Sequence, residues 1–370
     1  MGNSFLRAII FWMGIFELLA GWRGWRGLSW LGGRRGAMLA APLPVLALAG
    51  LSGGRALRAL RLILAAPVAL AIQVAAASVR NHALDPLLRL QPGPHSDRVV
   101  TDVHIAMSEG HLPAIEIVPQ AGAAMAVCLL HGSGDHKTAY TWWMVDALLA
   151  RGIATLLVDL DGHGDNPRTQ RFPQITEDVT AAVGWLRERY VRVGVLGVSL
   201  GGCVAARAIA DGTPVDALVL MEAPPRLQFT RADKWREGQA LLRPHTLTIF
   251  QDCTAYHIAR TWSTTPIRAA ISTWDLIDAL DLLGSLPRIS VPLLALHGGS
   301  DAIVKPAQAL QVRDALPPGA AFRLVPGASH LTLFLRPDIQ QAVAIWFLQA
   351  MAGPSHEQKG IGSLNQSPTR

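Results

Sequence analysis

The stretch VRVGVLGVSLGG, residues 191–202, is an apolar run that leads directly into a serine flanked by glycines. Within it, Gly197 to Gly201 form a G-x-S-x-G pentapeptide at the junction of a predicted strand and a predicted helix. Such a turn is so tight that its flanking positions have no space for a side chain, and its serine hydroxyl stands above the strand ends. The alternative is an ordinary glycine-rich turn in which Ser199 caps the helix. The flanking sequence has to distinguish a nucleophilic Ser199 from a structural one.

Short apolar runs alternate with amphipathic segments from residue 97 to residue 351. The first two runs, 97–107 and 113–119, predict an antiparallel pair, and the later runs predict parallel strands joined by helices. All-apolar strands are typical of a sheet covered on both faces, so we expect an α/β fold with a mostly parallel sheet and helices on both faces. The expected parallel strands are 125–130, 153–159, 191–198, 215–221, 291–297 and 320–326, and the expected helices are 138–152, 176–190, 200–212, 306–317 and 338–351.

Three segments do not follow this alternation. Residues 223–288 contain three tryptophans and predict a mostly helical cap, inserted before the strand 291–297. Residues 1–95 form an apolar, arginine-rich extension, and the polar residues 353–370 predict a disordered tail. We therefore expect one main domain over residues 96–352.

A serine hydroxyl needs a base to attack at neutral pH, and the base needs a third group to orient it. Asp301 follows the expected strand 291–297, and His330 follows the expected strand 320–326. The carboxyl ends of parallel strands meet at one edge of the sheet, so both side chains are expected beside Ser199. Each residue alone is more often structural than catalytic, but their order along the chain fits a triad. Weaker candidates are His297 for the base and Asp275, Asp278 and Glu222 for the acid.

Acyl transfer also needs hydrogen-bond donors for the developing oxyanion. One expected donor is the backbone N–H of Leu200, directly after the nucleophile. The second is expected from the glycine-rich loop 129–137, where we select the N–H of Ser133, with Gly132 as its neighbour. We interpret His131 and His163 as structural residues of their loops. We predict no metal site and no dinucleotide cofactor, because the sequence contains neither a metal-ligand motif nor a G-x-G-x-x-G motif.

Five segments resemble the ordered motif set of the alpha/beta hydrolase family, and most closely its serine esterase, lipase and monoacylglycerol-lipase-like branch. They are LLHGSGDHK (129–137), LLVDLDGHGDN (156–166), VLGVSLGG (195–202), LHGGSDAIV (296–304) and VPGASHLTLF (325–334). The resemblance covers residues 97–351. It implies Ser199, Asp301 and His330 as a catalytic triad and Ser133 and Leu200 as the oxyanion hole. The chain departs from the pattern at Asn166, where relatives often carry a serine.

This resemblance implies a serine hydrolase that cleaves a small-molecule carboxylic ester through an acyl-enzyme intermediate, without a cofactor. The aromatic residues of the expected cap favour an apolar acyl group. A thioesterase or an amidase would use the same residues, because one fold hosts many reactions. The alternative from a different functional class is a membrane-tethered binding protein that has the hydrolase fold but no catalytic activity.

The positive charge of the chain is concentrated in its first 95 residues. They hold ten arginines against Glu17 and Asp85, a net charge of +8, whereas residues 96–370 carry −2. A domain that binds nucleic acid carries a basic face, so this distribution argues against a nucleic-acid partner. Arginines between apolar runs are instead typical of segments that flank a membrane.

Three apolar runs lie in this extension, at residues 5–20, 37–51 and 62–79. A membrane-spanning helix needs about 17–25 apolar residues, and only the run 62–79 reaches that length. Membrane insertion, an arm that lies in the membrane interface, a cleaved export signal and a misassigned start codon all stay open. The three cysteines form no disulfide or metal pattern, so we expect a reducing compartment. Together with the apolar runs, this predicts a membrane-associated protein whose main domain lies in the cytoplasm.

Overall fold

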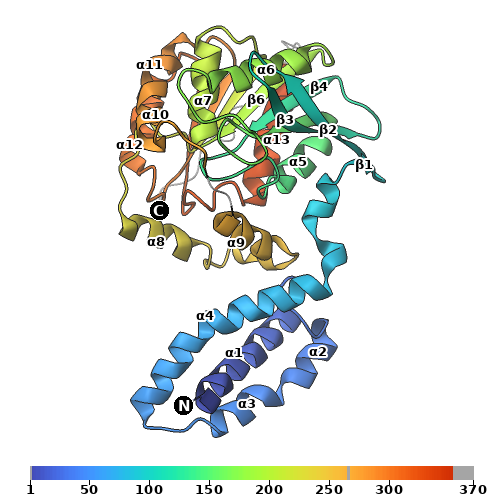
Figure 1. Cartoon of the computed structure of the whole chain (residues 1–370), viewed down its shortest axis with the longest axis vertical. Coiled ribbons are helices and arrows are strands. Elements are labelled where there is room, and N and C mark those ends of the chain that lie inside the picture. The colour runs from blue at the N-terminus through green and yellow to red at the C-terminus, as the bar shows by residue number, and fades with distance from the viewer. Residues whose placement is uncertain (1, 265–266, 353–370) are drawn as a thin grey trace, which may run out of the picture.

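The computed structural model describes residues 2–264 and 267–352. The chain forms two parts stacked along the long axis of the molecule (Figure 1). Helices α1 to α4 form a module at one end, and a nine-stranded sheet with its helices forms the other end. The segment 353–370, for which we expect disorder, lies outside the described residues.

The sheet has the strand order β1-β2-β3-β5-β4-β6-β7-β8-β9. The pairs β1–β2, β2–β3 and β3–β5 are antiparallel, and all later neighbours are parallel, which confirms the predicted architecture. Strands β4 and β6 lie in the middle of the order, so the residue after β6 stands near the centre of the sheet edge. The strands are β1 (Gly93–Pro94), β2 (Arg98–Ala106), β3 (His111–Pro119), β4 (Met125–Leu130), β5 (Ile153–Val158), β6 (Arg192–Val198), β7 (Ala217–Met221), β8 (Leu293–Gly298) and β9 (Ala321–Val325).

Helices cover both faces of the sheet, and each face has its own core. On one face α6 and α7 pack on the strands through residues such as Val179 and Val204. On the other face α5 and α13 contribute Trp142 and Phe347, both almost completely buried. These helices are α5 (Trp142–Leu149), α6 (Thr176–Arg187), α7 (Leu200–Ala210), α12 (Pro306–Ala315) and α13 (Pro337–Met351). Helix α5 begins four residues later than predicted, because Tyr140 has a φ of +40°, which a right-handed helix does not accommodate.

The inserted region 223–288 divides into two sets of helices with different contacts. Its later part, α10 (Thr273–Leu280) and α11 (Leu282–Ser285), packs against α7 and belongs to the core of the sheet domain. Its earlier part, α8 (Arg231–Ala240), the short 3₁₀ helix η3 (Leu247–Phe250) and α9 (Thr254–Thr264), lies between the sheet domain and the N-terminal helices (Figure 1). The remaining short 3₁₀ helices are η1 (His82–Leu84), η2 (Pro86–Leu90) and η4 (Leu286–Arg288).

The N-terminal module contains α1 (Gly2–Arg23), α2 (Gly33–Ala40), α3 (Pro42–Ala49) and α4 (Arg55–Arg80). Both α1 and α4 are long and apolar enough to cross a membrane, although the sequence predicted sufficient length for the third apolar run alone. The prediction missed α1 because the apolar run 5–20 is short and is interrupted by Arg7 and Glu17. In the structure this carboxylate is fully buried and accepts four hydrogen bonds, from Ser29 Oγ, Gln73 Nε2 and the backbone N–H groups of Trp30 and Leu31.

The module docks on the earlier part of the inserted region. Trp25 and Leu28, in the loop after α1, form an apolar cluster with Ile249, Phe250 and Ile258. Gly27 donates its N–H to the carbonyl of Phe250 at 2.8 Å. A side chain at position 27 would come within 1.6 Å of the Asp252 carbonyl oxygen, so this close approach requires glycine.

Candidate active site

Ser199 occupies the sharp turn between β6 and α7. Its backbone has a φ of +51° and a ψ of −115°, a strained conformation for a residue with a side chain. A Cβ at Gly197 would lie 2.5 Å from the carbonyl oxygen of Gly201, and one at Gly201 would lie 2.6 Å from the carbonyl oxygen of His131. The glycines of the pentapeptide are therefore required by close packing, as the sequence predicted.

The structure brings the three predicted triad residues into contact. His330 Nε2 lies 3.1 Å from Ser199 Oγ, and His330 Nδ1 lies 2.9 Å from Asp301 Oδ2. The other oxygen of Asp301 accepts the N–H groups of Ile303 and Val304, each at 2.7 Å. These two bonds fix the orientation of the carboxylate so that its Oδ2 atom faces the imidazole of His330. The three side chains follow β6, β8 and β9, at one edge of the sheet.

The pKa of His330 lies above its ordinary value. Burial alone lowers this pKa, but the neighbouring Asp301 carboxylate and the hydrogen bond to it outweigh that effect. The buried carboxylates of Glu237 and Asp135 act in the same direction. The site therefore stabilises a protonated imidazole, the state that a histidine reaches after it takes a proton from a serine.

The loop 131–134 lies close to Ser199. A Cβ at Gly132 would lie 3.5 Å from the Cβ of Ser199, so glycine allows this loop to come close to the hydroxyl. The hydroxyl of Ser133 lies 3.1 Å from that of Thr273, and Leu200 is buried as the first residue of α7. The roles of Ser133 and Leu200 as oxyanion donors stay predictions.

Both loop histidines make bonds within the scaffold. His131 Nε2 accepts the N–H of Leu160 at 3.1 Å, so its Nδ1 carries the proton and donates to the carbonyl of Gly132 at 2.8 Å. His163 is also buried, and its Nδ1 lies 2.9 Å from the carbonyl oxygen of Asp161. Burial lowers the pKa of both histidines, so neither is charged at neutral pH.

Asn166 braces the second glycine-rich loop, at the position where the sequence departs from the family pattern. It is fully buried. Its amide nitrogen donates to the carbonyl of Asp159 at 2.9 Å and to Asp161 Oδ1 at 3.2 Å. Its oxygen accepts the N–H of Arg168 at 3.0 Å, so both ends of the amide are hydrogen-bonded within this loop.

Of the weaker acid candidates, Glu222 lies nearest to the site. It is fully buried with a φ of +57°, and both carboxylate oxygens lack a hydrogen-bond partner among the described residues. Burial and the nearby Asp301 raise its pKa well above the ordinary value, which favours the protonated carboxyl. In the described part of the chain, Glu222, Asp301 and His330 alone place three possible metal-ligating atoms within 4.8 Å of one another. A protonated carboxyl is a poor metal ligand.

The other weak candidates lie in different surroundings. His297 is fully buried inside β8, and burial lowers its pKa to about 4. Asp275 and Asp278 lie on α10, where Asp275 accepts from Ser272 and Asp278 pairs with Arg226. None of these three is bonded to Ser199 or His330 in the described chain.

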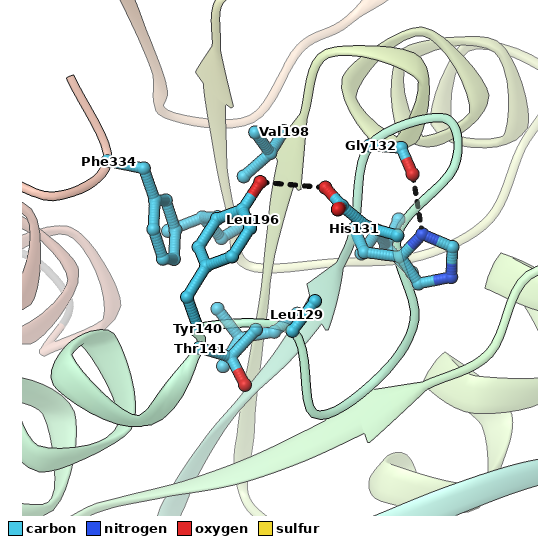
Figure 2. Close-up of a pocket in the computed structure, with 11 residues that line it drawn as sticks. Leu129, His131, Gly132, Tyr140, Thr141, Leu196, Val198 and Phe334 are labelled. Carbon is cyan, nitrogen blue, oxygen red and sulfur yellow. Dashed lines mark hydrogen bonds between the residues drawn. The ribbon is translucent and has the colours of Figure 1, made fainter. Parts of the chain in front are cut away.

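Sequence reasoning missed a small pocket lined by Val198, the residue before the serine (Figure 2). Tyr140 and Phe334 stack edge to face at this pocket, with ring centres 5.8 Å apart. Tyr140 donates its hydroxyl to Asp135 Oδ2 at 2.7 Å, and Leu196 also lines the pocket. The volume of the pocket is about 10 Å³, roughly the space of one water molecule. No sequence signal separates Asp135 and Tyr140 from ordinary loop residues.

Asp135 gives the first testable prediction. Burial raises its pKa to about 7, so ionisation of this carboxyl opposes folding as the pH rises from about 4 to 7. Asp135→Asn keeps an acceptor for Tyr140 but cannot ionise. We expect the variant to match the wild type near pH 4 and to exceed it at pH 8 by up to about 4 kcal/mol in free energy of unfolding.

Urea unfolding of the full chain at both pH values measures this difference. Asp314→Asn, on the exposed surface, is the control and should follow the wild type at both pH values. Parallel pH profiles for Asp135→Asn and the wild type would show that ionisation of Asp135 is not opposed by the fold.

Comparisons with known proteins agree with this fold. A sequence model described as the alpha/beta hydrolase family matches residues 127–340. The pimeloyl-[acyl-carrier protein] methyl ester esterase of Chromobacterium violaceum is 30% identical over 257 residues, which cover 67% of this chain and 95% of that protein. The protein of the same name from Serratia marcescens is 27% identical, over 57% of this chain and 88% of its own.

Two solved structures show the same fold. The alpha/beta hydrolase GrgF from a Penicillium species has a TM-score of 0.54 at 18% identity, and the match covers 68% of this chain and 99% of that one. An esterase from Exiguobacterium antarcticum has a TM-score of 0.51 at 17% identity and covers 67% of this chain and 100% of its own. The similarity to the monoacylglycerol-lipase-like branch stays a prediction.

Proposed function

Since the chain belongs to the alpha/beta hydrolase family, we propose that it cleaves a carboxylic ester with Ser199 as the nucleophile. The observation that carries this proposal is the continuous hydrogen-bonded series from Ser199 Oγ through His330 to Asp301, with separations of 3.1 Å and 2.9 Å. These distances lie within reach of proton transfer. The esterase relatives support an ester as the substrate.

In the proposed mechanism the Ser199 Oγ attacks the ester carbonyl while His330 Nε2 takes its proton. The pair of electrons of the carbonyl moves to its oxygen, and the negative charge is stabilised by the N–H groups of Ser133 and Leu200. The intermediate collapses when the protonated His330 returns its proton to the leaving alcohol, which leaves an acyl group on Ser199. Water then attacks this acyl-enzyme by the same proton transfers and releases the acid.

The acyl group is proposed to be apolar. Leu196, Val198, Tyr140 and Phe334 line an apolar pocket, and Val198 directly precedes Ser199 in the chain. The relatives named above are methyl ester esterases of an acyl group carried by a protein. An apolar acyl group therefore suits these surroundings.

A series of p-nitrophenyl esters from acetate to dodecanoate tests this proposal on the purified full chain. We expect turnover of the short esters and a change in kcat/KM along the series, because one methylene contributes about 1–3 kcal/mol when it fits an apolar site. No turnover of any ester would favour the non-catalytic alternative. An unchanged rate across the series would exclude an apolar acyl site.

Residues 1–80 are proposed to hold the protein at a membrane. Fourteen of the 23 large hydrophobic side chains that are exposed in the described chain lie between Leu6 and Val79. Apolar exposure of this extent is unusual on a surface in contact with water. In α4, the 18 residues between Arg61 and Arg80 span about 27 Å, close to the hydrocarbon thickness of about 30 Å. Full-length protein should remain in the membrane pellet after a carbonate wash, and its release would exclude insertion.

A further inference from the structure

A basic pocket lies where α1 meets the loop that leads to α2. Its volume is about 250 Å³, and it is lined by Trp22, Arg23, Trp25, Arg26 and Arg34 together with small residues of the loop. The side chains of all three arginines are exposed, and none forms an ion pair with a described residue. Glu17 is the one acidic residue before Asp85 in the sequence, and its four hydrogen bonds occupy it in the interior of the module. The charge of the pocket is therefore not neutralised by the module itself.

The surroundings of the pocket fit the surface of a membrane. Trp22 is 72% exposed, and the guanidinium of Arg23 lies 5.0 Å from its ring centre. Tryptophan and arginine together are typical of the level of lipid headgroups. Exposed apolar side chains of the module, such as Leu39 on α2 and Ile63 on α4, add to this surface.

We propose that this pocket binds the phosphate of an anionic glycerophospholipid headgroup. Planar guanidinium groups form paired hydrogen bonds with phosphate oxygens, and three of them in one pocket match a single negative headgroup. The proposal rests on membrane attachment of residues 1–80, but not on ester hydrolysis. Because Gly27 of the same loop is bonded to Phe250, a bound headgroup would also hold the inserted region against the membrane surface.

The test uses full-length protein in dodecyl maltoside micelles and measures the unfolding temperature. Dioctanoyl-phosphatidylglycerol should raise it by several degrees, whereas dioctanoyl-phosphatidylcholine and inorganic phosphate at the same concentration should not. The variant R23Q/R26Q/R34Q should bind phosphatidylglycerol at least about tenfold more weakly. The matched control R55Q/R58Q/R61Q removes three arginines at the opposite end of the module and should bind like the wild type.

If both triple variants bound phosphatidylglycerol equally weakly, the loss would come from the lower net charge alone, and the proposed site would be overturned. An equal response to phosphatidylcholine would show that the acyl chains alone bind, and an equal response to phosphate would show a soluble anion as ligand. If the triple variant does not fold, the single variant Arg34→Gln gives the same comparison, because this exposed side chain makes no hydrogen bond or ion pair with a described residue. Release of the protein by carbonate would separately contradict membrane attachment.

A second inference comes from a different observation, the buried carboxylate of Glu237 on α8. Glu237 is 2% exposed. Its Oε1 accepts the N–H of Ala302 at 2.6 Å, and its Oε2 accepts the N–H of Leu331 at 3.3 Å. Ala302 follows Asp301 directly, and Leu331 follows His330. One side chain of the inserted region thus connects the two loops that carry the proposed acid and base.

We infer that Glu237 is a positioning residue that aligns these two loops, so that docking of α8 completes the site. This inference rests on the proposed triad. Glu237→Gln keeps the size of the side chain but turns an amide N–H₂ toward one of the two N–H donors, which breaks one bond. We expect kcat for a short ester to fall about 10-fold to 100-fold with KM changed less than threefold.

The pH profile separates alignment from a general loss of structure. The charge of Glu237 raises the pKa of His330, so the midpoint of kcat/KM against pH should move to lower pH in Glu237→Gln. Gln239→Ala, an exposed residue of the same helix, should change neither value. Wild-type kcat and pH midpoint in Glu237→Gln would overturn this inference alone, whereas an active Ser199→Ala enzyme would overturn the triad on which it rests.

Discussion

Ser199→Ala is expected to lower kcat for p-nitrophenyl butyrate by about 10⁴-fold to 10⁶-fold, the range found when the nucleophile of a serine triad is removed. The alanine keeps the turn between β6 and α7 but has no oxygen to attack the carbonyl. The residual rate would come from the oxyanion donors and from substrate binding. The full chain should also lose covalent labelling by a fluorophosphonate probe, which reacts with an activated serine.

The control for this prediction is Ser108→Ala, because Ser108 is exposed and bonded to Glu177, away from the site. This variant should retain the wild-type rate and labelling. Equal labelling of Ser199→Ala and the wild type would refute the proposed nucleophile. Loss of labelling with full ester turnover would show that another group performs the hydrolysis.

Asp301→Asn is expected to lower kcat about 10⁴-fold, because an amide at this position favours the wrong tautomer of His330. The pH dependence should change as well. In the wild type, Asp301 holds the pKa of His330 above its ordinary value, and the base must be neutral to act. The residual kcat/KM should therefore rise with pH around a lower midpoint in the variant than in the wild type.

Glu222 is the alternative candidate for the acid that orients His330, and a second variant distinguishes it from Asp301. Because burial and Asp301 raise the pKa of Glu222 well above its ordinary value, an uncharged glutamine should replace it well, and Glu222→Gln should retain most of the activity. If Asp301→Asn kept near wild-type activity and the double variant D301N/E222Q lost it, Glu222 would be the acid in place of Asp301. If both single variants were inactive, the two carboxyl groups would act together on His330.

The centre of the sheet was predictable from the sequence because its parallel strands are buried on both faces. An apolar run such as 153–158 is typical of a strand between two layers of helices, and β5 is buried at every position. Ser199, Asp301 and His330 were predictable for a related reason. Each lies in the loop or turn after a parallel strand, so the parallel topology places them at one edge.

Other features depend on contacts between segments that are distant in the sequence. In the sequence, Glu237 is one of several charged residues on a polar helix. Its two bonds to Ala302 and Leu331 form only when α8 packs against the loops that carry Asp301 and His330. The start of α5 was misplaced because the sequence gives no signal for the positive φ of Tyr140. Helix α1 was underestimated because Glu17 counts as an interruption until its partners are known.

The partners of Glu17 also constrain how the protein is made. Its carboxylate is bonded to Ser29 and to Gln73, which leave the ribosome 12 and 56 residues later. Until then the nascent α1 carries an acidic group whose transfer into hydrocarbon is costly. Under the proposed membrane attachment, the carboxylate of the first helix has all its buried partners only after the fourth helix has emerged, so α1 and α4 have to pair before the module is complete.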